Sequence, residues 1–354
     1  MRFRFAFLAI SLIKICIVMY FSFFPTTFFG GGNDSTFYDA YAQGEDSQIP
    51  NVWPVVLRKL NDLGMYSRSG VSYVLALLGV CVVPLLAARL AVIRFQFFQA
   101  PTFWFVAFVI ATYPTLFFYT FDIYRDVLMV FLFLLGLFAV RSFINSASAL
   151  TTIYSMCIVM CISYALFLLR PYLGFGFLMA FLGFRIFKFN TVPLTIYLAC
   201  FLAALNSAFA LSFLDPLFIY RGIFDDMDGG TNIGIRFESN HLFVFDFLKS
   251  ATYQIFGFYF PNFPSILVFI AESVPFMISL GYLIKNRRYA NPFVSYLFTF
   301  SLVYSTIWIL GNDNLGTAVR LRMYAYISIF IAAVIISQRK RGCDHGDHKF
   351  GVYR

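Results

Sequence analysis

Long apolar runs recur along this chain, and they constrain its fold more than any other feature of the sequence. A run of about 17–25 apolar residues is long enough to cross a bilayer as a helix. Because lipid offers no partners for backbone groups, such runs form helices rather than open strands. About ten runs occur, of which the fourth and the sixth are short. The predicted spans lie near residues 5–24, 71–93, 102–121, 127–140, 150–169, 171–187, 192–213, 264–284, 293–310 and 323–338.

The composition also indicates that lipid surrounds most of the chain. Of its 354 residues, 60% are hydrophobic and 12% are charged, and the mean hydropathy is +0.78. A soluble domain contains about 25% charged residues. We therefore predict an all-α, polytopic transmembrane bundle of about ten helices. Residues 1–338 would form a single transmembrane domain, with two larger periplasmic loops (25–70 and 214–263) carrying interfacial helices, followed by a basic cytoplasmic tail at 339–354.

The distribution of charge predicts the orientation of the spans. The net charge of +9 would suggest a nucleic-acid partner only if the basic residues shared a water-facing surface. Here they lie between apolar runs, so we expect no nucleic acid. If both termini are cytoplasmic, every cytoplasmic turn satisfies the positive-inside rule. Fourteen of the 17 acidic residues then fall on the outer side, counting Asp122 and Asp126 at its edge.

Two charged residues lie inside predicted spans. The first span follows Arg2 and Arg4, but its length and the lack of a cleavage site before Gly30 predict a retained anchor rather than a signal peptide. Lys14 within it should face the bundle interior or a watery cavity, because a lipid-facing ammonium costs several kcal/mol. Glu272 in the eighth span needs a partner or a proton, and Lys14 is one candidate partner.

The first outer loop contains the sharpest local feature, GGGNDSTFYDAYAQGED at 30–46. A carboxylate there, Asp34 or Asp39, could act as a general base on a sugar hydroxyl. The alternative is an aspartate that caps the following helical turn. Aromatic rings stack on the apolar faces of sugars, and His241 is expected to be an interfacial hydrogen-bonding residue rather than a base. The candidate sugar and interface contacts are Tyr38, Tyr41, Trp53 and His241.

Two loop segments predict helices lying at the membrane surface. The segment NVWPVVLRKLNDLGMY at 51–66 is amphipathic, and HLFVFDFLKSATYQIFGFYF at 241–260 is dense in aromatic residues. In the first segment the predicted apolar face consists of Val52, Val55, Val56, Leu60 and Leu63.

Arginines recur at the outer ends of the predicted spans. Arginine offers a planar fork of donors that fits phosphate oxygens, so several together would hold a diphosphate and stabilise it as a leaving group. Single members have alternatives: Arg125 could pair with Asp122 at i, i+3, and Arg170 could extend to the interface. The candidate diphosphate-binding residues are Arg125, Arg170, Arg221, Arg236, Arg320 and Arg322.

No soluble-enzyme motif occurs in the chain. It contains no GxxxxGK[ST] loop, GxSxG elbow, HExxH helix or Rossmann fingerprint, which excludes ATP-driven transport by this chain alone. Five of the six cysteines lie in apolar runs, where cysteine behaves as a small hydrophobe. The run DDMDGG at 225–230 lacks the spaced ligands of a calcium loop. We expect no metal and no cofactor.

Four segments resemble the bacterial O-antigen and exopolysaccharide repeat-unit polymerases (Wzy-like), which are related to the GT-C membrane glycosyltransferases. They are the Asp-x-x-x-Tyr-x-x-x-Ala pattern of Asp34, Tyr38 and Ala42, YPTLFFYTFDIYRDVLMVFL at 113–132, LRPYLGF at 169–175 and NDNLGTAVRLR at 312–322. The resemblance implies that outer arginines hold the diphosphate of a lipid carrier without metal or nucleotide, a role that falls on Arg125, Arg170, Arg221 and Arg320. The long loop departs from the pattern, since Arg221 and Arg236 lack a clear copy of the family's spaced Arg and Gly motif.

The expected function is a polysaccharide polymerase that transfers an undecaprenyl-diphosphate-linked glycan to a lipid-linked repeat unit on the periplasmic face. Its expected partners are undecaprenyl-linked oligosaccharides and membrane lipid, with chain-length regulator and flippase proteins beside it. One alternative is a GT-C transferase that uses a polyprenyl-phosphate sugar. A flippase or permease, or a structural subunit of an envelope complex, would belong to other classes.

Overall fold

The computed structural model describes residues 2–23, 33–47, 51–93, 100–186, 189, 191–222 and 231–344. Within these ranges every regular element is a helix, and a single isolated β-bridge joins Asn232 to Asn314. The all-helical prediction is confirmed for the described residues. The chain forms two compact units, Met1–Leu178 and Met179–Arg354, and each is described by itself.

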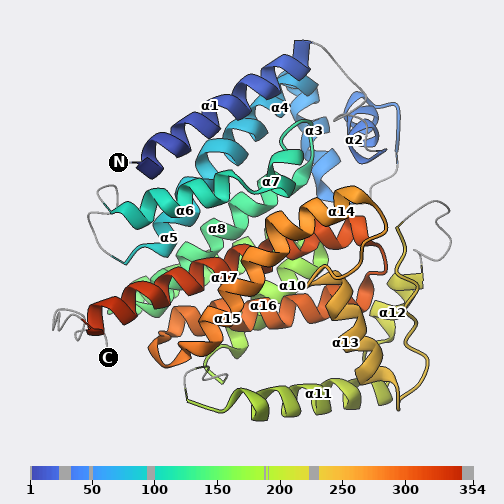
Figure 1. The fold of residues 1–354 in the computed structure, drawn as a ribbon. Helices are drawn as coiled ribbons and strands as arrows, with labels where there is room; N and C mark the ends of the chain where they lie inside the picture. The colour runs from blue at the N-terminus through green and yellow to red at the C-terminus, as the bar shows by residue number, and fades with distance from the viewer. Residues whose placement is uncertain are drawn as a thin grey trace. The chain divides into compact units, whose positions relative to one another are not determined.

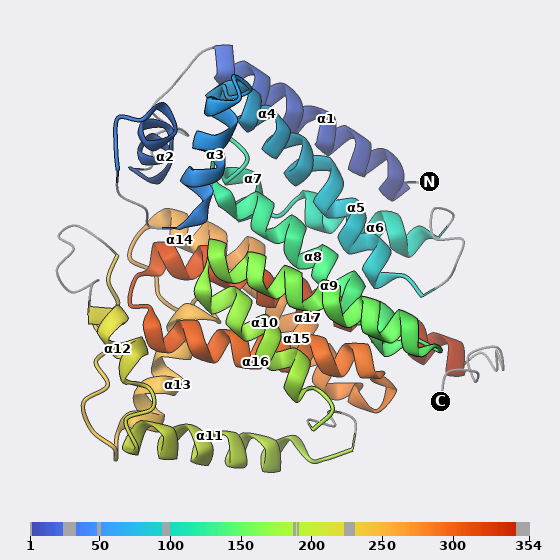
Figure 2. The ribbon, with the colours of Figure 1, turned by 180° about the vertical axis from the view of Figure 1, so that it is seen from behind.

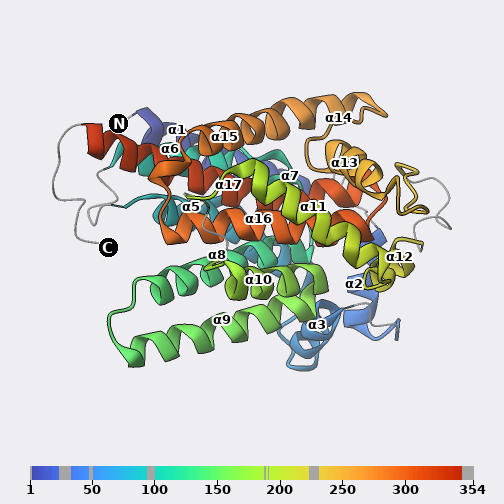
Figure 3. The same ribbon diagram turned by 90° about the horizontal axis from the view of Figure 1, so that it is seen from below.

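The first unit is built from helices α1 to α9 and the first part of α10 (Figure 1). Helix α1 lies along α4 and α6, as Figure 2 shows, and α8 runs beside α9 in Figure 3. The bounds are α1 (Arg2–Phe23), α2 (Asn33–Gln43), α3 (Val52–Asp62), α4 (Arg68–Leu77), the π-helical turn η1 (Leu78–Val82), α5 (Val83–Ala91), α6 (Pro101–Ala111), α7 (Pro114–Phe118), α8 (Arg125–Ile144), α9 (Ala149–Leu169) and α10 (Pro171–Gly183).

The second unit has its core where α15 and α16 pack on α17. The Tyr304 hydroxyl of α16 donates to the Leu321 carbonyl of α17 at 3.0 Å, and the Phe276 ring of α15 stacks on Tyr326 at 4.1 Å between centroids. The bounds are α11 (Leu194–Ala210), α12 (Asp215–Gly222), α13 (Phe243–Gln254), α14 (Phe263–Val268), the π-helical turn η3 (Phe269–Ser273), α15 (Val274–Lys285), the 3₁₀ turn η4 (Arg287–Tyr289), α16 (Pro292–Gly311) and α17 (Leu315–Asp344).

Local sequence signals determine where many of these helices begin. Asn51, Ser67, Ser148 and Asn291 each accept a hydrogen bond from a backbone N–H in the first turn of the next helix. Such caps satisfy donors that have no partner inside the helix. Proline stands at the first position of α6, α7 and α10, where its missing N–H costs nothing.

Among the described residues, seven helices are long and apolar enough to cross a membrane, so a multi-pass membrane protein is supported, while the predicted ten spans are not confirmed. An eighth span results if α11 and α12, which bend by 75° at their junction, count as one. The predicted span at 102–121 breaks before Pro114, because a residue preceding proline is driven out of the helical region. The span at 171–187 ends early, since α10 stops at Gly183. The seven are Arg2–Phe21, Arg68–Ala91, Arg125–Ile144, Ala149–Leu169, Phe263–Lys285, Pro292–Gly311 and Leu315–Cys343.

Both predicted loop helices are present, but the buried face of the first differs from the prediction. α3 buries Trp53 and Leu57, whereas Val56 and Leu63 of the predicted apolar face are exposed. Trp53 lies on the buried face because its indole N–H finds an acceptor inside the unit, the Ile123 carbonyl at 2.7 Å. α13 corresponds to the second predicted segment, and α17 continues into the predicted tail.

Lys14 lies inside the unit, as its position in the first span predicts. Its ammonium donates to the Ala111 carbonyl at the end of α6 and lies 4.1 Å from the centroid of the Phe117 ring. The carbonyl end of a helix and the face of an aromatic ring both stabilise a cation. Glu272 was one candidate partner for Lys14, but its carboxylate lies 3.6 Å from Arg322 instead.

Gly174 is a point of close contact between α9 and α10. A Cβ atom at this position would lie 2.3 Å from the Phe167 backbone nitrogen and 2.5 Å from the Ser163 carbonyl oxygen. Backbone atoms cannot move aside as a flexible side chain can. We expect Gly174→Ala to lower the free energy of unfolding by about 1–3 kcal/mol, as overpacking does, measured by thermal unfolding in detergent.

Gly281 is the matched control for this substitution. It lies within α15, and a Cβ there meets no atom within 4 Å. Alanine raises helix propensity by roughly 1 kcal/mol over glycine, so Gly281→Ala should leave stability unchanged or improve it. Equal melting of the two variants would contradict the close packing of α9 on α10.

Candidate functional site

Five side chains of the first unit form a charged cluster, named here the Arg68 cluster: Ser35, Asp39, Tyr66, Arg68 and Asp122. The Arg68 guanidinium binds both oxygens of Asp122, with Nε–Oδ1 at 3.0 Å and Nη2–Oδ2 at 2.5 Å. Its Nη1 lies 3.3 Å from Asp39 Oδ2. Arg68 thereby joins α2 to the segment that precedes α8, at the end of the unit where α4 begins.

Tyr66 and Ser35 complete the cluster. The Tyr66 hydroxyl donates to Asp39 Oδ1 at 2.5 Å, and Ser35 Oγ lies 3.5 Å from Arg68 Nη2. Burial, followed by the hydrogen bond to Asp39, raises the pKa of Tyr66 well above its ordinary value. Burial opposes ionisation of Asp122, but hydrogen bonds from Arg68 and the Ile123 N–H outweigh it and lower the pKa of Asp122.

The cluster is accessible on one side. The side chain of Arg68 is 38% exposed and that of Asp39 is 17% exposed, whereas Asp122 is 9% exposed. The buried carboxylate therefore anchors the guanidinium, and the other carboxylate lies nearer the surface. A hydroxyl-bearing molecule or an anion can reach Asp39 and Arg68 from this side.

The segment 122–126 gathers contacts from four parts of the first unit. Besides Asp122, it offers the Ile123 carbonyl to Trp53, and Arg125 donates to the Leu169 carbonyl at 2.7 Å. Asp126 is buried and lies 3.6 Å from Arg170, which follows α9 at the break before Pro171. Arg125 and Arg170, predicted separately, thus both contact this junction of α8, α9 and α10.

The arginines of this region occupy unusual positions. Arg68 and Arg125 are the first residues of α4 and α8. The positive end of the helix dipole disfavours a cation there, by about 0.3–1 kcal/mol at an exposed site. Asp122 and Asp39 offset this cost at Arg68 by direct contact. These ion pairs hold the Arg68 guanidinium at a position that the helix dipole alone would disfavour.

The predicted carboxylates lie on α2, but the predicted aromatic contacts are mostly buried. Asp34 is half-buried in the first turn of α2, which also fits the capping interpretation. Tyr38 and Tyr41 are only 3% and 7% exposed. Together with the buried Trp53, they have little ring surface open to a sugar, because their faces pack within the unit. The Gly-rich turn at 30–32 lies outside the described residues.

In the second unit, Arg221 is the centre of a buried polar network rather than an open cation. Its guanidinium donates to the carbonyls of Ile235, Ile309 and Asn312 at 3.0, 2.9 and 2.5 Å, and it forms an ion pair with Asp313. Its guanidinium carbon also lies 4.9 Å from the centroid of the Phe237 ring. These contacts give Arg221 a structural role that the prediction of diphosphate binding did not include.

The rest of this network connects residues 231–235 to residues 312–315. Asp313 accepts from the Gly234 and Ile235 N–H groups at 2.8 and 3.3 Å, and the Asn232–Asn314 bridge continues the connection. Gln254 of α13 donates to the Asn312 carbonyl at 3.0 Å and accepts from the Asn312 amide at 2.7 Å. The acidic run at 225–228 lies outside the described residues.

The remaining predicted residues of the second unit are dispersed. Arg322 is 2% exposed and lies 3.6 Å from Glu272 in the π-helical turn η3, with Tyr326 beside it. Arg320 is half-buried, while Arg236 and His241 are exposed. These positions do not gather the arginines of this unit into one phosphate site.

Of the Arg68 cluster, only Asp39 was predicted as a site residue. Neither Arg68 nor Tyr66 belongs to a motif, and Asp122 was noted as an acidic residue of the outer side and as a partner for Arg125. One signal was available: Ser67 is a strong N-cap residue, so it predicts a helix that begins with Arg68, where a cation is unfavourable. No family model, curated protein or solved structure matches the chain.

Proposed function

We propose that this protein is a membrane glycosyltransferase that polymerises lipid-linked repeat units. An undecaprenyl-diphosphate-linked glycan would be transferred to a hydroxyl of an incoming lipid-linked repeat unit on the periplasmic face of a bacterial inner membrane, with both termini cytoplasmic. The observation that supports this proposal is the Arg68 cluster, which sets a partly exposed carboxylate beside a partly exposed guanidinium at one end of a helical membrane unit.

The proposed chemistry assigns a proton acceptor and a leaving-group partner. Asp39 accepts the proton of the acceptor hydroxyl as its oxygen attacks the anomeric carbon of the donor glycan. The bond between that carbon and the diphosphate breaks, and the electron pair leaves with the lipid diphosphate. Half-buried Arg125 and the exposed side of Arg68 face the developing charge, and Asp39 later returns its proton to water.

Asp34 is the alternative base on the same helix. The two aspartates are five positions apart on α2, so they project about 140° from each other at 100° per residue and serve different sides of the helix. Hydrogen bonds from Arg68 and Tyr66 fix the orientation of the Asp39 carboxylate. Comparison of the two variants separates these roles.

The glycan profile of a deletion strain, resolved on a gel, tests the proposal. Loss of polymerase activity should leave a single lipid-linked repeat unit in place of a ladder. Complementation with the wild type should restore the ladder, and Asp39→Asn should fail to restore it if Asp39 is the base. Failure of Asp34→Asn alone would transfer the role to Asp34.

Asp62→Asn is the matched control, because Asp62 is an exposed aspartate on α3 that forms an i, i+3 pair with Lys59. Exposed ion pairs of this kind contribute little to stability, so this variant should restore the full ladder. A glycan that lacks one sugar would instead indicate the GT-C single-sugar transferase. An unchanged profile in the deletion strain would refute both enzyme proposals.

A permease remains the second candidate because of one observation in the second unit. Glu272 and Arg322 are both buried within helices of spanning length, and Glu272 lies in a π-helical turn. Ionisable residues inside spans often belong to substrate or proton pathways, and π-helical turns are frequent at functional sites. This candidate would become the leading one if the glycan profile of the deletion strain were unchanged.

A further inference from the structure

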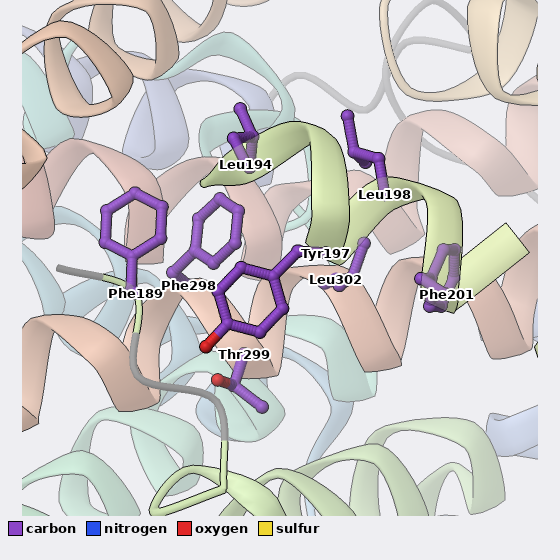
Figure 4. A pocket seen from close by; sticks show the side chains of 8 residues that line it. All are labelled: Phe189, Leu194, Tyr197, Leu198, Phe201, Phe298, Thr299 and Leu302. Carbon is purple, nitrogen blue, oxygen red and sulfur yellow. The ribbon is translucent and has the colours of Figure 1, made fainter. Parts of the chain in front are cut away.

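A groove in the second unit lies between α11, α16 and Phe189 (Figure 4). The groove is open to the surroundings and encloses only about 30 Å³, so a bound chain would lie along it rather than inside a closed pocket. Six of its eight lining side chains are hydrocarbon only. The lining consists of Phe189, Leu194, Tyr197, Leu198, Phe201, Phe298, Thr299 and Leu302.

The walls of the groove are loosely joined. Leu205 is the one buried residue of α11 among its described side chains, and the Phe189 ring stacks on Phe298 at 4.1 Å at one end. An apolar helix with so little burial of its own gains from any hydrocarbon that fills the space beneath it. The groove therefore suits a chain of methylene groups rather than a polar solute.

Two hydroxyl groups lie within the otherwise apolar lining. Thr299 is 2% exposed, and its hydroxyl has no hydrogen-bond partner among the described residues. Figure 4 shows the Tyr197 ring reaching across the groove with its hydroxyl end toward Thr299. A buried hydroxyl without a partner costs about 1–3 kcal/mol, and the ester group of a lipid would supply an acceptor.

The end of the groove where α11 and α16 begin is strongly basic. Arg287 of η4 donates to the Val192 carbonyl at 2.7 Å, two residues before Leu194 in the groove lining. Lys285 and Arg288 are exposed beside it. Among the described residues of 183–194 and 285–292, which lead into both walls, four are basic and none is acidic. Basic pockets between membrane helices are suited to anionic lipid headgroups.

From this charge complementarity we infer that the groove is a binding site for an anionic phospholipid. One acyl chain lies between α11 and α16, and the phosphate contacts the cations at 285–288. The lipid comes from the leaflet that faces the basic turns of the chain. This site does not depend on the proposed transferase activity, because all of its residues belong to the second unit, whereas the Arg68 cluster belongs to the first.

Native mass spectrometry of the full chain in detergent tests the inference. Phosphatidylglycerol should bind at least about tenfold more tightly than phosphatidylcholine with the same acyl chains. The double variant Lys285→Gln/Arg288→Gln should weaken the binding of phosphatidylglycerol by roughly 25-fold, at about fivefold for each cation removed. Arg341→Gln, an exposed cation of α17, is the control and should bind as the wild type does.

The chain-binding part of the site needs its own variant. Leu198→Trp fills the groove with a bulky ring, and because Leu198 is 44% exposed the unit should still fold, as thermal unfolding would verify. Binding should fall at least about tenfold, whereas Ile196→Trp, outside the lining on the same helix, should have no effect. Glycerol phosphate, a headgroup without chains, should not compete. Equal binding of both lipids, or unchanged binding by Leu198→Trp, would overturn the inference.

Discussion

Arg68→Gln should abolish the polymer ladder and lower the thermal stability of the protein. The substitution removes the bidentate contact with Asp122 and the contact with Asp39 in one step. Hydrogen bonds to charged groups contribute about 1.5–3 kcal/mol each to folding stability. Because the side chain of Arg68 is 38% exposed, solvent screening reduces this contribution. We expect a stability loss of about 1–2 kcal/mol and a loss of polymer of at least roughly tenfold.

Arg68→Lys distinguishes charge from geometry in the same experiment. Lysine keeps the positive charge but cannot bind both oxygens of Asp122 with a planar fork. It should restore part of the stability and little of the ladder. Lys59→Gln removes an exposed cation of α3 and should change neither, because its pair with Asp62 is fully at the surface. A complete ladder from Arg68→Gln would exclude the Arg68 cluster from the reaction.

The pH dependence of stability gives an independent check on the Arg68–Asp122 pair. The pKa of Asp122 is lower in the folded protein than in the unfolded chain. The pair therefore contributes stability above the unfolded pKa, at about pH 4, and loses it as the pH falls through the folded pKa. The difference in stability between the wild type and Arg68→Gln should be constant near neutral pH and shrink below about pH 4.

Apolar run length and capping residues predicted the all-helical fold and many of its helices, because both act locally. Proline and glycine also determined where two predicted spans failed: Pro114 divides one, and α10 ends at Gly183. Sequence could not predict which polar residues meet, since Arg68 and Asp122 are 54 positions apart. Arg221 and Asp313 are 92 apart, and only the fold brings them together.

The residues of the candidate site were predicted only in part. Asp39 lies on the predicted loop segment, and its partners Arg68 and Tyr66 come from a stretch with no motif. Tyr38 and Tyr41 were predicted from their chemistry as sugar contacts, yet their burial places them in the packing of α2. An aromatic residue in a loop serves a core and a ligand equally well, and sequence does not distinguish the two uses.

Arg221→Met should be among the most destabilising substitutions in the second unit. It leaves the Asp313 carboxylate buried without its cation, and three backbone carbonyls lose a donor. Removal of one partner of a buried pair typically costs about 3–5 kcal/mol. Because Arg221 also anchors the segment at 231–235, that segment should detach before the rest of the unit unfolds.

Limited trypsin digestion measures the detachment of the segment 231–235, and thermal unfolding measures the loss of stability. Arg236 is exposed and lies one residue beyond the anchored segment, so cleavage after Arg236 should accelerate in Arg221→Met. Arg185→Gln, which removes another exposed arginine of this unit, should leave cleavage and melting unchanged. If Arg221→Met melted as the wild type does but lost the polymer ladder, Arg221 would be a ligand-binding residue, as its sequence context predicts, and the network would not depend on it. Loss of stability together with faster cleavage would instead make Arg221 an anchor, because a residue that only binds substrate leaves the free protein intact when removed.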